Sequence, residues 1–192
     1  MAGPLEGIRV ADFTWVWAGP TCTMQLAHMG AEVIRMESMR RVCTLRMLPP
    51  WPNGQPGVNR SGYFNQYNQG KRSIQLDISQ PEGADLAKQI VATSDVAVEN
   101  FASNVIDRLG LGYEEMRKVK PDLIMMSMSG YGRGGPESDA TRPGSFLPSK
   151  VACMCVSQMT FRKPSRSLQG SVRQHRFFLA DHDRVVGVRC QS

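Results

Sequence analysis

Short runs rich in apolar positions, some of them alternating with polar ones, occur along the first two-thirds of the chain, and stretches with helical spacing separate these runs. The runs predict five strands, at residues 7–13, 31–37, 73–78, 95–99 and 123–128. The stretches between them predict four helices, at residues 21–28, 81–93, 104–109 and 113–119. Because strands and helices alternate, the sequence predicts an α/β fold with a Rossmann-like parallel sheet and flanking helices.

Two further expectations concern single segments. The helix at 81–93 opens with Pro81 and is expected to bury Leu86, Ile90 and Val91. Residues 40–67 show no such spacing, and their prolines and glycines predict one long loop. A loop of this length usually has a function or moves.

The composition changes after Asp139. Residues 1–139 carry 14 Lys or Arg and 15 Asp or Glu, whereas residues 140–192 carry nine basic residues and two acidic ones, Asp181 and Asp183. The net charge of +6 therefore belongs to the tail. We expect an α/β domain at 1–139 and a basic, disordered tail at 140–192. A basic tail can bind polyanions, but without a nucleic-acid-binding motif we do not expect nucleic acid as a partner.

Other classes of protein are disfavoured by simple counts. No apolar run has the length of a membrane span, so we expect no membrane insertion. The five cysteines are odd in number, and the pair Cys153 and Cys155 lacks a second pair or nearby histidines, so no metal site is expected. Reduced thiols favour a cytoplasmic location. The three histidines form no recognisable grouping with Ser, Cys or Asp.

Two short motifs have more than one interpretation. The turn at 17–20, Trp-Ala-Gly-Pro, lies between a predicted strand and a helix, where α/β proteins bind phosphate groups. Its spacing is not that of a dinucleotide fingerprint, and on physical grounds alone a purely structural turn is favoured. Lys71 and Arg72 can contact phosphate oxygens, although a solvated strand end is the simpler interpretation.

Taken together, six segments resemble the opening of family III CoA-transferases, a group that includes formyl-CoA:oxalate and carnitine CoA-transferases and the α-methylacyl-CoA racemases. The segments occur in the family's order and cover the chain from about Pro4 to Asp139. They are residues 4–20, 30–37, 70–74, 95–101, 107–110 and 129–132.

The resemblance implies roles in binding coenzyme A for seven residues: Trp17, Ala18, Lys71, Arg72, Asn100, Phe101 and Arg108. Trp17 and Ala18 match the turn that contacts CoA in the family. Asn100 and Phe101 match a strand end along the path of the pantetheine and nucleotide.

The basic members of this set match segments near the phosphates. Lys71 and Arg72 correspond to a segment close to the nucleotide end of CoA, and Arg108 corresponds to an arginine near its phosphates. Family members often carry a basic residue where this chain has Ser38, and here Arg40 and Arg41 follow it instead.

The resemblance implies transfer of CoA between an acyl-CoA thioester and a small carboxylic acid, with no prosthetic group and no metal. In the family an aspartate attacks the thioester, giving a mixed anhydride and then an enzyme–CoA thioester. Its expected position falls near Arg173, and the surroundings of Asp181, the nearest aspartate, do not match. The catalytic residue is therefore unassigned.

Family members are longer and form interlocked homodimers, so we expect a truncated or frame-shifted product with impaired catalysis. The alternatives are a non-catalytic CoA-binding fragment and a racemase-type isomerase.

Overall fold

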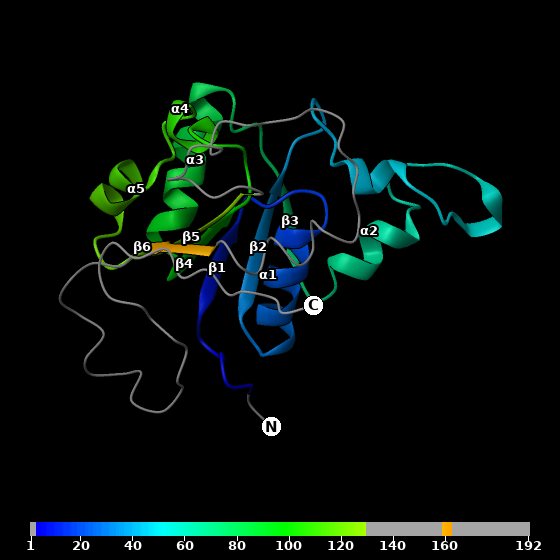
Figure 1. Ribbon diagram of the computed structural model, residues 1–192, viewed down its shortest axis with the longest axis horizontal. Helices are drawn as coiled ribbons and strands as arrows, with labels where there is room; N and C mark the ends of the chain where they lie inside the picture. Colours follow the sequence, from blue (N-terminus) through cyan, green and yellow to red (C-terminus); the bar gives the residue numbers. More distant parts are fainter. Residues whose placement is uncertain (1–2, 130–158, 163–192) are drawn as a thin grey trace, which may run out of the picture.

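A computed structural model describes residues 3–129 and 159–162, and Figure 1 shows a twisted sheet with helices on both faces. The strands are β1 (Arg9–Asp12), β2 (Glu32–Glu37), β3 (Arg72–Gln75), β4 (Val96–Glu99), β5 (Ile124–Met128) and β6 (Met159–Arg162). The α-helices are α1 (Ala18–His28), α2 (Gly62–Tyr67), α3 (Pro81–Ala92), α4 (Val105–Arg108) and α5 (Tyr113–Val119). Two short 3₁₀ turns, η1 (Thr44–Met47) and η2 (Pro52–Gly54), precede α2.

The strand order, β3-β2-β1-β4-β5-β6, confirms the predicted α/β fold with a parallel sheet. β1 pairs in parallel with β2 on one side and with β4 on the other, so the chain winds outward through β3 and then returns to the middle. Such a reversal leaves a crevice at the carboxyl ends of the two central strands, where open α/β sheets bind ligands. The topology therefore places the candidate site between β1 and β4.

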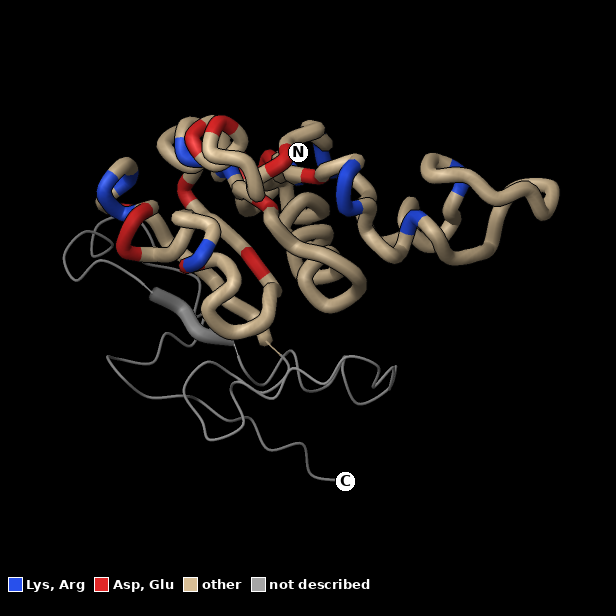
Figure 2. Tube along the Cα trace, turned by 90° about the horizontal axis from the view of Figure 1, so that it is seen from above, with Lys and Arg blue, Asp and Glu red and all other residues tan. Residues whose placement is uncertain are grey.

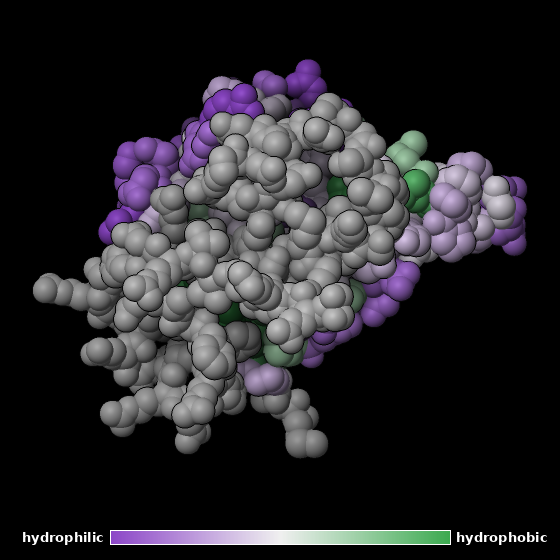
Figure 3. Space-filling view, viewed as in Figure 1, coloured by the Kyte–Doolittle hydropathy of each residue, from purple (hydrophilic) through white to green (hydrophobic). Residues whose placement is uncertain are grey.

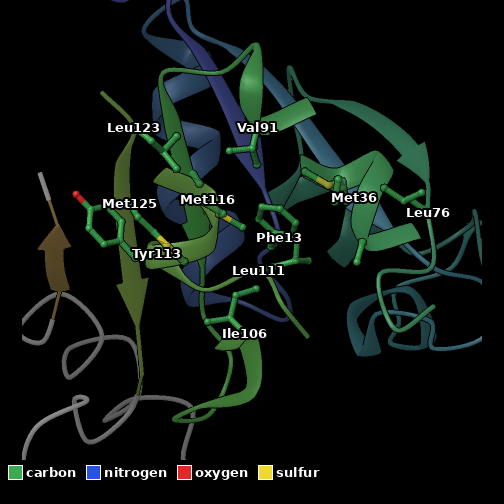
Figure 4. Close-up of a cluster of buried hydrophobic side chains, with 14 residues drawn as sticks. Phe13, Met36, Leu76, Val91, Ile106, Leu111, Tyr113, Met116, Leu123 and Met125 are labelled. Carbon is green, nitrogen blue, oxygen red and sulfur yellow. The ribbon is translucent and has the colours of Figure 1, made fainter. Parts of the chain in front are cut away.

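Alternating residues of the central strands fill two apolar layers. Val10 and Val98 face α1, whereas Ala11, Ala97 and Met125 face α3 and α5. All five side chains are at most 2% exposed, and Figure 4 shows the second of these layers. Strands buried on both faces are typical of parallel sheets, and they form the rigid support for the loops at the sheet's edge.

Helix α3 packs through a different set of residues than predicted. Val91 is buried as expected, but Leu86 is 49% exposed, so its predicted burial is wrong. The helix instead approaches the sheet through the small residues Gly83, Ala84 and Ala87. A Cβ atom at Gly83 would lie 1.9 Å from the carbonyl oxygen of Asp77. The helix therefore packs through close contact of its backbone with the sheet, and not through a large apolar side chain such as Leu86.

The predicted long loop contains helical turns. Residues 40–67, here called the arm, project from the sheet (Figure 1) and include η1, η2 and α2. The Ser61 hydroxyl accepts a hydrogen bond from the Phe64 backbone N–H, which caps α2. The same hydroxyl lies 2.6 Å and 2.7 Å from the carbonyl oxygens of Leu45 and Leu48. Helices of one or two turns carry too few residues for a periodic signal, which explains why the sequence did not reveal them.

The segment expected to be an irregular tail contains one described strand. β6 pairs antiparallel with β5, with Met128 opposite Met159. The remainder of residues 140–192 lies outside the described residues. Within the part of the chain that the structure describes, no helix is both long enough and apolar enough to cross a bilayer.

The packing of α3 predicts a contrast between two substitutions in one helix. Val91→Ala should lower the free energy of unfolding by about 2 kcal/mol, because it removes two fully buried methyl groups and leaves a cavity. Leu86→Ala should change it by less than about 0.5–1 kcal/mol, since half of that side chain already contacts water. Urea denaturation measures both values, and an equal or larger loss for Leu86→Ala would contradict the observed orientation of α3.

Candidate functional site

The turn between β1 and α1 lies at the switch point of the sheet. Its backbone reverses through Val16, whose φ of 60° is in the left-handed region. Helix α1 then begins at Ala18, and its N-cap residue Trp17 makes no side-chain capping bond to the helix. The first N–H groups of a helix have no partner within it and attract negative charge. The turn therefore presents backbone donors at the carboxyl edge of the sheet.

Asn100, directly after β4, clamps this turn to the neighbouring strand. Its side-chain oxygen accepts a hydrogen bond from the Trp15 N–H at 2.7 Å, and its amide nitrogen donates to the Trp15 carbonyl, also at 2.7 Å. The Phe101 ring packs edge-on against Trp15, with centroids 6.4 Å apart. A Cβ at Gly19 would lie 2.9 Å from the Asn100 side chain, so the start of α1 fits closely against it. The structure thus brings together the predicted site residues of the turn and of β4.

A buried carboxylate lies beneath the turn. Asp12, at the end of β1, is fully buried and accepts hydrogen bonds from the Thr14 N–H at 2.8 Å and the Thr14 hydroxyl at 2.5 Å. Its second oxygen accepts from the Thr23 hydroxyl at 2.7 Å, from within α1. The same oxygen lies 3.2 Å from the ammonium of Lys71. These contacts fix where β1 ends and how α1 leaves it.

Lys71, predicted near the nucleotide end of CoA, has its ammonium enclosed in the protein. The side chain is 2% exposed, and its three N–H donors are directed to Asp12, to the Pro20 carbonyl at 2.9 Å and to the Asn68 side-chain oxygen at 3.0 Å. Burial lowers the pKa of Lys71 from 10.5 to about 8, although the neighbouring Asp12 carboxylate favours the charged form. Lys71 thus supports the start of α1 from below.

The two predicted arginines lie on opposite sides of β1 in the sheet. Arg72 opens β3, is largely exposed, and forms a 2.7 Å ion pair with Glu32 at the start of β2. β3 lies two strands from β1, and this ion pair directs the Arg72 side chain away from the turn. Arg108 closes α4, which follows β4 at the carboxyl end, and its side chain is exposed. Of the predicted set, Arg72 is the residue that the fold separates from the others.

A second charged cluster, which the sequence did not reveal, joins the arm to the sheet. Arg46 in η1 forms a bidentate ion pair with Glu37 at the end of β2, with distances of 2.8 Å and 2.9 Å. The Arg46 guanidinium also lies 3.5 Å from the centre of the Phe64 ring. Burial raises the pKa of Glu37, but hydrogen bonds from Arg46 and the charge of Arg35 outweigh it, so the net pKa is lowered. Glu37 therefore stays ionised and holds the arm.

The charge of the arm is all of one sign. It contains four arginines and no acidic residue, and Figure 2 shows only basic residues along it. Met47 within the arm and Met39, the residue just before it, are more than half exposed. Figure 3 shows apolar side chains where the arm leaves the body.

Three aromatic rings border the turn on the side of the arm. Trp17 lies 5.5 Å from Tyr63 and 6.4 Å from Tyr67, and the two tyrosines are 5.5 Å apart between ring centroids. All three side chains are half-buried. Burial, followed by the neighbouring Tyr63, raises the pKa of Tyr67, which agrees with apolar surroundings. Trp17 was predicted from the sequence, but its aromatic partners were not.

Candidate reactive groups are few in the part of the chain that the structure describes. Residues 3–129 and 159–162 contain no group of three or more His, Cys, Asp and Glu side chains able to hold a metal. Burial raises the pKa of the Cys22 thiol to about 11, and Asp12 contributes, so this thiol stays protonated near neutral pH. The position near Arg173 and the residue Asp181 lie outside the described residues.

Comparison with known proteins gives one consistent family. The sequence profile of CoA-transferase family III matches residues 5–166. Succinyl-CoA:glutarate CoA-transferase of Mus musculus is 43% identical over 136 residues, which is 70% of this chain and 30% of that protein. Formyl-CoA:oxalate CoA-transferase of Afipia carboxidovorans is 42% identical, covering 70% of this chain and 31% of its own length.

A solved structure agrees with these matches. The crystal structure of a CAIB/BAIF family protein from Brucella suis has a TM-score of 0.65 and 34% identity, over 72% of this chain and 36% of that chain. The chain spans about a third of the length of the curated relatives that it matches.

The buried Lys71 predicts a pH dependence of stability. Its pKa is lower in the folded state than in the unfolded chain, so its contribution to stability is complete above pH 10.5 and is lost as the pH falls to about 8. Cys22 has the opposite sign, contributing below pH 9.0 and losing that contribution as the pH approaches 11. Lys71→Arg keeps the charge but does not titrate in this range. The difference in unfolding free energy, wild type minus Lys71→Arg, should therefore rise between pH 8 and 10.5.

Urea denaturation at several pH values measures this difference, and the Cys22 contribution is common to both proteins. Lys118→Arg, at an exposed lysine of α5, is the matched control and should give a flat difference. A flat difference for Lys71→Arg as well would contradict the burial of this charge.

Proposed function

The chain belongs to CoA-transferase family III, and from this premise we propose that it binds the CoA portion of an acyl-CoA thioester at the β1–α1 turn. The reaction to which this binding belongs is transfer of CoA between the thioester and a small carboxylic acid. The named relatives are transferases acting on succinyl-CoA with glutarate and on formyl-CoA with oxalate. No prosthetic group is needed, because CoA itself is the group transferred.

The observation that carries this proposal is the clamp between Asn100 and the backbone of Trp15. It holds the start of α1 against the end of β4 at the switch point, where a ligand meets backbone N–H groups from the turn. Asp12 and Lys71 support the same turn from below. A site whose backbone donors are fixed before binding loses less entropy when the ligand arrives.

The individual roles follow from these positions. Trp17 and Ala18 line the turn, while Asn100 and Phe101 border the path of the pantetheine along β4. Arg108 and the exposed Arg41 of the arm supply positive charge for the phosphates. Lys71 acts by positioning the turn. Arg72 is left out of the proposed site because it lies two strands from β1 and its guanidinium is paired with Glu32.

Catalysis is a separate question from binding. In the proposed reaction a carboxylate must attack the thioester carbonyl and later carry CoA as an enzyme thioester. We assign no residue of this chain to that step. We propose CoA binding with impaired transfer, because none of the residues that the structure describes is assigned as the nucleophile. We further propose that the protein works as a cytoplasmic homodimer.

Titration calorimetry of the 192-residue chain with free CoA tests the proposal. We expect saturable binding, and absence of any binding heat would remove the proposed function. Mass spectrometry after incubation with acyl-CoA tests impairment separately, since a covalent enzyme–CoA adduct would show that the chain does transfer CoA.

Arg108→Ala should weaken CoA binding by roughly 1–3 kcal/mol, because it removes a charge-assisted contact with a phosphate. Arg72→Ala is the matched control, another exposed arginine whose partner is Glu32, and it should leave the dissociation constant unchanged. Calorimetry with CoA at low salt measures both. Equal losses for the two variants would indicate general attraction by positive charge and remove Arg108 from the site.

A further inference from the structure

The three rings beside the turn form a continuous apolar surface, here called the aromatic wall, made of Trp17, Tyr63 and Tyr67. The rings come from two elements that are distant in sequence, the head of α1 and helix α2. Every pair lies within 6.4 Å between centroids, and each side chain remains partly exposed. The wall therefore begins at the turn that we propose for CoA and continues away from β4.

Helix α2 has aromatic side chains on one face and contacts arginine side chains on another. Tyr63 and Tyr67 are four residues apart and share the face toward Trp17. Phe64, one residue on from Tyr63, is buried on a different face against the guanidinium groups of Arg35 and Arg46.

The cations behind α2 are paired or buried. Arg46 is held by both oxygens of Glu37. Arg35 is 1% exposed and donates to the Asn68 side-chain oxygen at 2.6 Å. Lys71 is enclosed by Asp12, Pro20 and Asn68. None of these three charges is available to a carboxylate that lies against the wall.

Because the nearby cations are not accessible, the aromatic wall favours some acyl groups over others. An acyl chain that ends in a carboxylate must keep that charge paired or hydrated, and aromatic faces supply neither. An aryl or other apolar acyl group gains by burying its surface and by stacking on the rings.

From these observations we propose that the aromatic wall receives the acyl group of the thioester and selects an aryl or apolar acyl-CoA over one whose acyl group ends in a carboxylate. This inference rests on the proposed CoA site, and it adds the substrate class of that site. Trp17, Tyr63 and Tyr67 act here as specificity-determining residues.

The test compares phenylacetyl-CoA with succinyl-CoA by calorimetry on the full 192-residue chain. Both ligands share the whole of CoA, so the ratio of their dissociation constants isolates the acyl group. We expect phenylacetyl-CoA to bind about tenfold more tightly or better, the gain from burying one aryl ring. Equal affinities, or tighter binding of succinyl-CoA, would overturn the inference.

Substitutions in the aromatic wall test whether it causes the difference between the two dissociation constants. Trp17→Gln should bring their ratio close to one, whereas Trp17→Phe, the matched variant that keeps a ring, should retain most of the preference. Tyr63→Asn probes the same wall from α2 and covers the case in which a change at Trp17 disturbs the turn. Circular dichroism confirms that each variant is folded.

Two further outcomes distinguish a failure of the acyl-group assignment from a failure of the proposed CoA site. If the rings stack on adenine instead, Trp17→Gln weakens free CoA and both thioesters equally and leaves the ratio unchanged, which refutes the acyl assignment alone. If free CoA does not bind at all, the proposed function itself fails.

Discussion

The buried ion pair between Asp12 and Lys71 is the contact on which the rest of the site depends. A fully buried carboxylate is stable only when its oxygens are paired, and here two threonines and a lysine supply the partners. These partners come from the turn, from α1 and from the residue before β3. One carboxylate therefore fixes three segments at once, and removing one partner would leave a buried charge unpaired. The turn above it owes its fixed geometry to this arrangement.

The arm is also held by an ion pair with a carboxylate at the end of a strand. Glu37 ends β2 as Asp12 ends β1, and its bidentate pair with Arg46 holds a segment that has little apolar core of its own. Phe64 and the residues packed with it, Cys43 and Leu45, form a small separate cluster within the arm. Because the ion pair and this cluster orient α2, they also decide where Tyr63 and Tyr67 meet Trp17. The aromatic wall is thus a consequence of charges buried behind it.

The proposed CoA site and the transfer step place different demands on this fold. The contacts that support the proposed site gather around β1, α1 and the end of β4, all within the part of the chain that the structure describes. The carboxylate required for transfer is not among the residues assigned to the site. The contacts that hold the turn in place therefore form without any of these residues being assigned as the nucleophile.

The sequence alone determined the α/β class and the five parallel strands, because strands and helices follow one another in a regular order. The turn and Asn100 were indicated as site residues by the resemblance to a family, since the residues of the turn by themselves favoured a structural role. The tertiary structure decided what depends on side chains meeting across the sheet. Lys71 is buried because it pairs with Asp12, which lies 59 positions earlier in the sequence. Leu86 is exposed because α3 approaches the sheet through Gly83 instead. Neither contact could be predicted from neighbouring residues in the sequence. Periodicity shows which side chains share one face of a helix or strand, but it does not show which residues of another element pack against that face.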